Sequence, residues 1–282
     1  MVHDGRTYDE DSLHTDAQGM TRRQTVLVTG ASGGIGKEFA RVFAQHGFDL
    51  VLVARNEERL ESLAGELSDR YGVTANVIAA DLSDEAAAER IRAEVHERGI
   101  VIDQLVNNAG AGKQMRTVDA DPDVLRGLIH LNVTSVTLMC RLFGADMVEQ
   151  GHGRILNVSS MGAFVPDPFF NVYGPTKAFE MRLTEAMRGE LAGTGVTVSA
   201  LCPGPVKTGW AANAGKADSG MAKGADLIAR LGYVGMQRGR LIIVPTMLYK
   251  AERVILGVLP EAAKVEVIGR WQMSLIEKGR EL

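Results

Sequence analysis

Short apolar runs alternate with longer amphipathic segments along most of this chain. The short runs are rich in Val, Leu and Ile, which is typical of strands buried on both faces, and the longer segments repeat apolar residues at helical spacing. The pattern predicts strands over Thr25–Thr29, Leu50–Ala54, Ala75–Ala79, Ile102–Asn107, Arg154–Val158 and Val196–Leu201, with a seventh around Arg240–Val244. It predicts helices over Gly34–Gln45, Asn56–Tyr71, Asp84–Arg98, Asp123–Glu149 and Val172–Ala192.

This alternation predicts an α/β fold, a doubly wound, Rossmann-like parallel sheet of about seven strands with helices on both faces. No internal repeat or low-complexity linker divides the chain, so we expect a single domain over residues 24–245. Residues 1–23 are polar and acidic, which favours a disordered tail.

Residues 246–282 are amphipathic, and we expect a helical extension packed on the domain or on a partner subunit. The alternative is a helix that rests on a membrane surface. Three acidic residues reduce the positive charge of this segment, which favours packing over membrane contact: Glu252, Glu261 and Glu266.

Composition narrows the class of function. The 282 residues are 45% hydrophobic and carry a net charge of −4, and no long basic run indicates nucleic-acid binding. The only cysteines, Cys140 and Cys202, lie in apolar stretches and are expected to be free thiols. The six histidines form no cluster with ligand spacing, so we expect no metal. A cytoplasmic protein is the expectation.

A glycine-rich turn follows the first predicted strand directly and leads into the first predicted helix. Such a turn brings the backbone close to a pyrophosphate, and the helix N-terminus supplies free N–H groups. A flexible loop is the alternative. The cofactor-binding candidates in this turn are Gly30, Ser32, Gly33, Gly34, Ile35 and Gly36.

The end of the second predicted strand indicates which nicotinamide cofactor is bound. NAD sites usually have a carboxylate there, whereas this strand ends with Arg55. A guanidinium suits a 2′-phosphate, so NADP(H) is preferred, with NAD(H) possible. Arg55 as a solvated residue at a helix start is the alternative. The glycine turn has no basic residue before Gly34, so the preference depends mostly on Arg55.

Tyr173 and Lys177 are four residues apart at the start of a predicted helix, so their side chains share one face. A nearby cation favours the phenolate and lowers the pKa of a phenol, as acid–base chemistry near neutral pH requires. Pro175 lies between them and is tolerated only in a first helical turn, which predicts that the helix starts just before Tyr173.

In order and spacing, these residues resemble the short-chain dehydrogenase/reductase family in its compact single-domain branch, over residues 24 to about 210. The matching segments are the glycine turn, Asp81-Leu82, Asn107 to Gly110, Asn132, Ser160, Tyr173, Lys177, and Pro203-Gly204 followed by Val206 and Thr208.

The resemblance implies the positions of the cofactor. Asp81 and Leu82 would flank the adenine, and Asn108, Ala109 and Gly110 would close the cofactor cleft. Pro203 and Gly204 would belong to the cofactor site, and Val206 and Thr208 would contact the nicotinamide carboxamide. Structural roles are the alternatives for two residues: Asp81 as a helix cap and Asn107 as a brace for the strand end.

The resemblance also implies a catalytic tetrad. Tyr173 would transfer the proton to or from the substrate oxygen. Lys177 would lower the pKa of Tyr173 and bind the nicotinamide ribose, and Ser160 would hold the carbonyl oxygen. Asn132 would distort the long fourth helix and hold a proton-relay water. Ser159 competes with Ser160, and the family's spacing to the tyrosine favours Ser160.

The sequence therefore predicts NADPH-dependent reduction of a ketone or aldehyde, or the reverse oxidation of a secondary alcohol. The alternatives are an epimerase or dehydratase with a tightly bound nucleotide, and a non-catalytic nucleotide-sensing scaffold. Residues 161–170, Trp210, Met221 and Tyr233 would line a hydrophobic substrate pocket or else pack elsewhere. By resemblance, a homodimer or homotetramer is expected.

Overall fold

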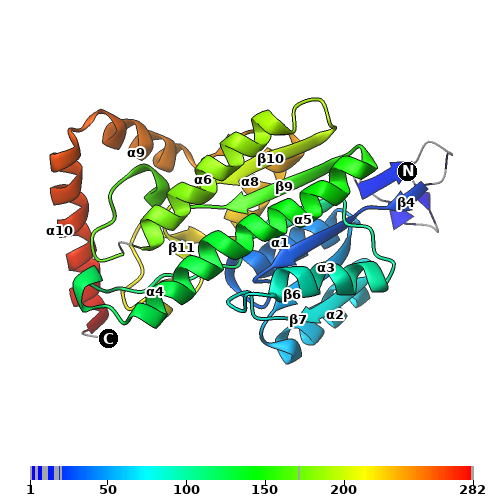
Figure 1. The fold of residues 1–282 in the computed structure, drawn as a ribbon, viewed down its shortest axis with the longest axis horizontal. Helices are drawn as coiled ribbons and strands as arrows, with labels where there is room; N and C mark the ends of the chain where they lie inside the picture. The colour runs from blue at the N-terminus through cyan, green and yellow to red at the C-terminus, as the bar shows by residue number, and fades with distance from the viewer. Residues whose placement is uncertain are drawn as a thin grey trace.

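A seven-stranded parallel sheet forms the centre of the molecule (Figure 1). The computed structural model describes residues 2–3, 6–7, 12–15, 19, 21–170 and 172–280. The strand order is β13-β10-β9-β8-β5-β6-β7, with every pairing parallel. The strands are β5 (Thr25–Thr29), β6 (Asp49–Ala54), β7 (Ala75–Ala79), β8 (Gln104–Asn107), β9 (Gly153–Val158), β10 (Val196–Leu201) and β13 (Ile242–Ile243). The predicted fold class is confirmed, including the seventh strand.

Helices cover both faces of this sheet. The buried cluster on one face includes residues of α1 (Gly34–Gln45), α2 (Glu57–Tyr71) and α8 (Ala225–Gln237). The cluster on the other face includes residues of α3 (Ala87–Glu97) and α5 (Ser135–Gln150), and Met187 of α6 (Tyr173–Glu190) and the capping residue Leu191 pack against it. All five residues of β5 are buried, as a strand between two helical layers requires.

The pattern analysis missed α8. Gly232 and Gly235 weaken its helical signal, because glycine is a poor helix former in a helix interior. Both glycines are needed for packing: a Cβ at Gly232 would lie 2.7 Å from the Phe39 ring, and one at Gly235 would lie 2.6 Å from Ile243. Close contact of α8 with α1 and with β13 therefore explains the glycines that weakened the helical pattern.

The predicted helix Asp123–Glu149 is interrupted. It consists of α4 (Pro122–Ile129), a π-helical turn over His130–Thr134, and α5. By length and composition Pro122–Gln150 could span a membrane, but 44% of its most apolar window is buried inside the protein. The apolar side chains of α5 pack in a core cluster together with the sheet residue Ile155, as in the core helix of a globular domain.

The N-terminal segment forms two antiparallel strand pairs where it is described: β1 (Val2–His3) with β2 (Arg6–Thr7), and β3 (Leu13–Thr15) with β4 (Thr21–Arg23). The guanidinium of Arg22 donates two hydrogen bonds of 2.7 Å to the buried carboxylate of Asp103. The disordered tail predicted over residues 1–23 lies partly outside the described residues and stays a prediction.

The C-terminal extension is helical. It contains α9 (Met247–Val258) and α10 (Glu261–Arg280), which lie at the end of the molecule opposite the N-terminus (Figure 1). Tyr249 of α9 is fully buried, and its hydroxyl donates a 2.8 Å hydrogen bond to the carbonyl of Pro205. Shorter elements are the 3₁₀ helices Thr117–Asp119 and Met161–Phe164, α7 (Trp210–Asn213), and the paired strands β11 (Val206–Lys207) and β12 (Lys223–Gly224).

Candidate active site

The predicted site residues gather where the central strands end. The glycine turn follows β5, Asn108 follows β8, Ser160 follows β9 and Pro203 follows β10. Because these strands are parallel and adjacent, their carboxyl ends share one edge of the sheet. Ligands of open α/β sheets bind in the crevice outside that edge. The topology therefore brings residues that are far apart in sequence into one site.

The glycine turn is shaped for close approach by a phosphate. Gly30 and Gly34 have φ values of +66° and +54°, which glycine adopts without steric cost. A Cβ at Gly36 would overlap the carbonyl oxygen of Gly30. The amide of Asn108 donates a 2.9 Å hydrogen bond to the carbonyl of Thr29 and braces the turn. The helix α1 begins at Gly34, so these residues fit a pyrophosphate at a helix N-terminus.

Arg55 lies in solvent at the end of β6. Its side chain is 79% exposed, and its Nη1 atom is 3.9 Å from the carboxylate of Asp81 at the end of β7. Burial acts to raise the pKa of Asp81, but hydrogen bonds from the backbone and side chain of Ser83 hold that pKa below its usual value. Leu82 is buried beside them. An accessible guanidinium thus stands where a ribose 2′-substituent would lie in the resembled family.

Tyr173 begins α6 as predicted, and Pro175 falls within its first turn. The side chain of Ser160 caps the 3₁₀ helix Met161–Phe164, where its hydroxyl accepts a 3.1 Å hydrogen bond from the backbone N–H of Gly162. Burial raises the pKa of Tyr173 above its usual value, and the nearby Ser160 side chain acts to lower it. Ser159 instead donates a 2.7 Å hydrogen bond to the carbonyl of Lys177 inside the protein. This geometry favours Ser160 over Ser159 as the partner of Tyr173.

Lys177 is held by two acceptors. Its Nζ atom donates to the carbonyl of Val158 at 2.9 Å and to the carboxylate of Glu180 at 2.7 Å. The side chains of Lys177 and Glu180 are 5% and 1% exposed. Sequence reasoning missed Glu180, although the Lys-x-x-Glu spacing, which places two side chains on one helical face, was a signal for it.

Asn132 lies within the π-helical turn, so the expected helix distortion is present at that residue. Its amide nitrogen donates to the carbonyl of Ala111 at 2.8 Å and to the hydroxyl of Thr176 at 3.0 Å. Its amide oxygen accepts a 3.0 Å hydrogen bond from the backbone N–H of Ala111. Asn132 therefore ties the loop after β8 to the first turn of α6.

The segment after β10 closes over the glycine turn. A Cβ at Gly34 would lie 3.2 Å from the side chain of Thr208. Pro203 accepts a 2.8 Å hydrogen bond from the backbone of Met161, and a Cβ at Gly204 would collide with the ring of Tyr249. Val206 continues this segment as part of β11. The segment after β10 therefore lies against the glycine turn at Thr208, and the contact of Val206 and Thr208 with a nicotinamide stays a prediction.

A small apolar cluster surrounds Tyr173. Its buried members are Phe170, Ala214 and Ile276, and Trp210 and Met273 pack against them. The ring centroids of Trp210 and Tyr173 are 4.8 Å apart. Two expected pocket residues lie elsewhere. Tyr233 is buried in α8 and packs against Phe43, and Met221 is 40% exposed. Tyr233 was misplaced because α8 was missed.

Hydrogen bonds between polar side chains join α10 to the loop after Ser160. Gln272 of α10 donates a hydrogen bond to the carboxylate of Asp167 and accepts one of 3.1 Å from Lys216. The ammonium of Lys216 also lies 4.2 Å from the ring centroid of Phe170. Burial raises the pKa of Asp167 to about 6, whereas Gln272 and Lys216 act to lower it. The C-terminal extension is thus part of the surroundings of Tyr173.

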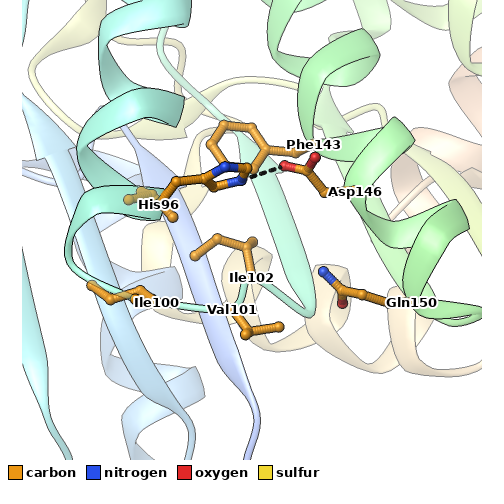
Figure 2. A pocket seen from close by; sticks show the side chains of 9 residues that line it. His96, Ile100, Val101, Ile102, Phe143, Asp146 and Gln150 are labelled. Carbon is orange, nitrogen blue, oxygen red and sulfur yellow. Dashed lines mark hydrogen bonds and ion pairs between the residues drawn. The ribbon is translucent and has the colours of Figure 1, made fainter.

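A pocket on the other edge of the sheet is separate from this site (Figure 2). It is lined by residues 95–96 at the end of α3, residues 99–102 before β8, and three residues of α5: Phe143, Asp146 and Gln150. His96 and Asp146 form a 3.0 Å hydrogen bond there. Because these loop residues lie before β8 begins, the pocket opens at the amino edge of the sheet, opposite the glycine turn.

The comparisons with known proteins agree with this architecture. The sequence profile of the family described as short chain dehydrogenase matches residues 24–219. The chain belongs to the short-chain dehydrogenase/reductase family. A very-long-chain 3-oxoacyl-CoA reductase from Anas platyrhynchos is 36% identical over 187 residues, which is 64% of this chain. The oxidoreductase UcpA from Salmonella typhimurium is 37% identical over 186 residues, or 66% of this chain and 70% of that protein. The match spans only 59% of the Anas platyrhynchos reductase.

Solved structures share the fold over most of the chain. A short-chain dehydrogenase from Sphingobium yanoikuyae in complex with NADPH is 32% identical, with a TM-score of 0.76 over 85% of this chain and 97% of that one. A bulky-bulky ketone specific alcohol dehydrogenase from Comamonas testosteroni is 29% identical, with a TM-score of 0.72 over 85% and 96%.

Proposed function

We propose that this protein catalyses the NADPH-dependent reduction of a ketone or aldehyde with bulky apolar substituents, and the reverse oxidation of the secondary alcohol. The observation that carries the proposal is that Tyr173, with Ser160 near enough to act on its pKa, packs against an apolar cluster of Phe170, Trp210 and Ile276. Bulky apolar side chains suit a hydrophobic carbonyl compound, and the paired hydroxyls suit its oxygen.

The chemistry divides between the cofactor and the chain. A bound nicotinamide supplies or accepts the hydride. Tyr173 donates a proton to the carbonyl oxygen in the reductive direction and removes it in the oxidative direction. Ser160 donates a hydrogen bond that stabilises the charge developing on that oxygen. The ammonium of Lys177 stabilises the phenolate of Tyr173, and Asn132 supports the helix turn that holds both residues.

Two relatives support the proposed cofactor and substrate class. The Sphingobium yanoikuyae structure contains NADPH, although a family structure from Burkholderia phymatum, 25% identical with a TM-score of 0.73, contains NAD. The Comamonas testosteroni enzyme acts on bulky ketones. The exposed Arg55 favours NADP for this chain.

A fluorescence titration with NADPH and NADH tests the proposal, using wild type, Arg55→Asp, and Arg70→Ala as a control at an exposed arginine of α2. We expect tighter binding of NADPH than NADH, and Arg55→Asp to lose about tenfold or more in NADPH affinity because a charged hydrogen bond to phosphate is removed. An equal loss of affinity for NADPH and NADH in Arg55→Asp would show that Arg55 does not select NADPH. Binding of neither nucleotide to wild type would contradict the proposed function.

We also propose that the chain assembles as a homodimer or homotetramer. Exposed apolar residues on the long helices, including Ile129, Val148 and Phe179, support this. Sedimentation equilibrium distinguishes two copies, four copies and a monomer, and a monomer at micromolar concentration would contradict the proposal.

A further inference from the structure

Glu180 is a buried carboxylate in direct contact with Lys177. It lies on α6 one turn beyond Lys177, and its Oε1 atom is 2.7 Å from the lysine Nζ atom. Its side chain is 1% exposed. A buried ion pair is costly to desolvate, so it contributes little to stability by default. A contribution to stability therefore does not explain why Glu180 is buried beside Lys177.

The contact fixes the position of the Lys177 ammonium. Nζ donates one hydrogen bond to Glu180 and one to Val158 at the end of β9. A Cβ at Gly110 would lie 3.1 Å from Nζ and 3.3 Å from the amide oxygen of Asn132. The ammonium is thus held between α6, β9 and the loop after β8.

Glu180 also changes the charge that reaches Tyr173. The Nζ atom of Lys177 lies 5.7 Å from the centroid of the Tyr173 ring, close enough to favour the phenolate. The negative charge of Glu180 opposes this effect and acts to raise the pKa of Tyr173. The two residues of the ion pair therefore act on the phenol in opposite directions.

The other titratable groups coupled to Glu180 come from the neighbouring elements. Cys140 of α5 and Cys202 after β10 each have a pKa raised to about 12, chiefly by burial, so both thiols are neutral near pH 7. Burial also raises the pKa of Glu180 to about 7, while Lys177 acts to lower it. Asp167 acts on Tyr173 from the loop after Ser160.

We propose that Glu180 is a positioning residue of the proton-transfer site: it holds the Lys177 ammonium in place and partly offsets the charge that Lys177 presents to Tyr173. This inference rests on the proposed function, because it assigns Glu180 a part in the same acid–base step. It predicts that removing the charge of Glu180, while keeping a hydrogen-bond acceptor, makes Tyr173 more acidic.

The test compares wild type, Glu180→Gln and Glu185→Gln. Glu185 lies on the same helix and pairs with Arg182 at the surface, so it is a matched control. The pH dependence of kcat/KM is measured for oxidation of benzhydrol with NADP⁺, together with the affinity for NADPH. In the same proteins, tyrosine carrying a heavy carbon isotope at Cζ reports ionisation of Tyr173 by NMR, with Tyr173→Phe to assign the signal.

We expect Glu180→Gln to move the acidic limb of kcat/KM, and the ionisation of Tyr173, to lower pH by about one unit. Glu185→Gln should move neither, and both variants should bind NADPH as wild type does. A loss of kcat with an unchanged pH profile, or a shift to higher pH, would overturn the proposal, because it would leave Glu180 a structural residue only.

A second variant tests the proposal if Glu180→Gln folds poorly. Glu180→Asp keeps the charge but shortens the side chain, so kcat should fall while the acidic limb stays at its wild-type position. If the acidic limb of kcat/KM moves in Glu180→Asp, the proposal that the charge of Glu180 acts on Tyr173 would be overturned. If wild type shows no turnover, the proposed reduction fails, while the NMR titration still tests the effect of Glu180 on Tyr173.

Discussion

The indole of Trp210 packs against the phenol of Tyr173, with their ring centroids 4.8 Å apart. Trp210 starts α7, immediately after the segment that closes over the glycine turn, and Tyr173 starts α6. The contact therefore joins the wall of the proposed cofactor site to the proposed proton donor. It places an aromatic surface beside the proposed position of the substrate carbonyl.

The first prediction concerns this contact. Trp210→Ala should lower kcat/KM for a bulky aromatic ketone about threefold to tenfold, because aromatic packing is worth about 0.5–1.5 kcal/mol. Trp210→Phe should retain most of the wild-type value. Steady-state kinetics with acetone beside benzophenone provide the measurement. An equal loss for both ketones would show that Trp210 does not select bulky substrates.

The second prediction concerns the C-terminal extension. Truncation after Pro245 removes the fully buried Tyr249 and the Gln272 contact with Asp167. The free energy of unfolding should fall by at least about 3 kcal/mol, because loss of a buried aromatic side chain alone costs that much. Urea unfolding measures it, with truncation after Arg280 as the control. A truncated protein that is as stable as wild type but no longer binds liposomes would favour the membrane-surface alternative.

The third prediction concerns Asp167, whose pKa burial raises to about 6 from an ordinary value of 3.8. Between these values the folded protein retains a proton that the unfolded chain has lost, so this residue makes stability fall as pH rises from about 4 to 6. Asp167→Asn removes the effect and keeps the oxygen that Gln272 contacts.

Thermal unfolding at several pH values tests this. The Tm of Asp167→Asn relative to wild type should increase from pH 4 to pH 7.5, by an amount corresponding to about 2–3 kcal/mol in stability. Asp69→Asn, on an exposed position of α2, should show no such trend. A Tm difference that is constant with pH would contradict a raised pKa at Asp167.

The sequence predicted the sheet well because its strands are buried on both faces and therefore read as unbroken apolar runs, as in β5. It also placed Tyr173 at the start of α6, because Pro175 is tolerated only there. The family resemblance supplied the order of the remaining site residues, and the topology accounts for their convergence at one edge of the sheet.

Other features depend on tertiary contacts that no local pattern reports. The glycines of α8 are required by Phe39 and Ile243, so they weakened the signal of a real helix. The hydrogen bond between Asp167 and Gln272 joins residues 105 positions apart. The spacing between Lys177 and Glu180 indicates that they share one face of a helix. Such a Lys-x-x-Glu pair usually lies at the surface, and only the structure shows that this one is buried.

Tyr173 is the proposed acid–base residue of an NADPH-dependent reductase. The most direct measurement is the turnover of Tyr173→Phe with NADPH and benzophenone, with NADPH affinity measured in parallel. Tyr71→Phe, which removes a hydroxyl that bonds to Gln45 at the surface, is the control. We predict unchanged NADPH affinity and a loss of about a hundredfold or more in kcat for Tyr173→Phe, because the proton donor is removed. Retention of most of the wild-type turnover by Tyr173→Phe would contradict the account.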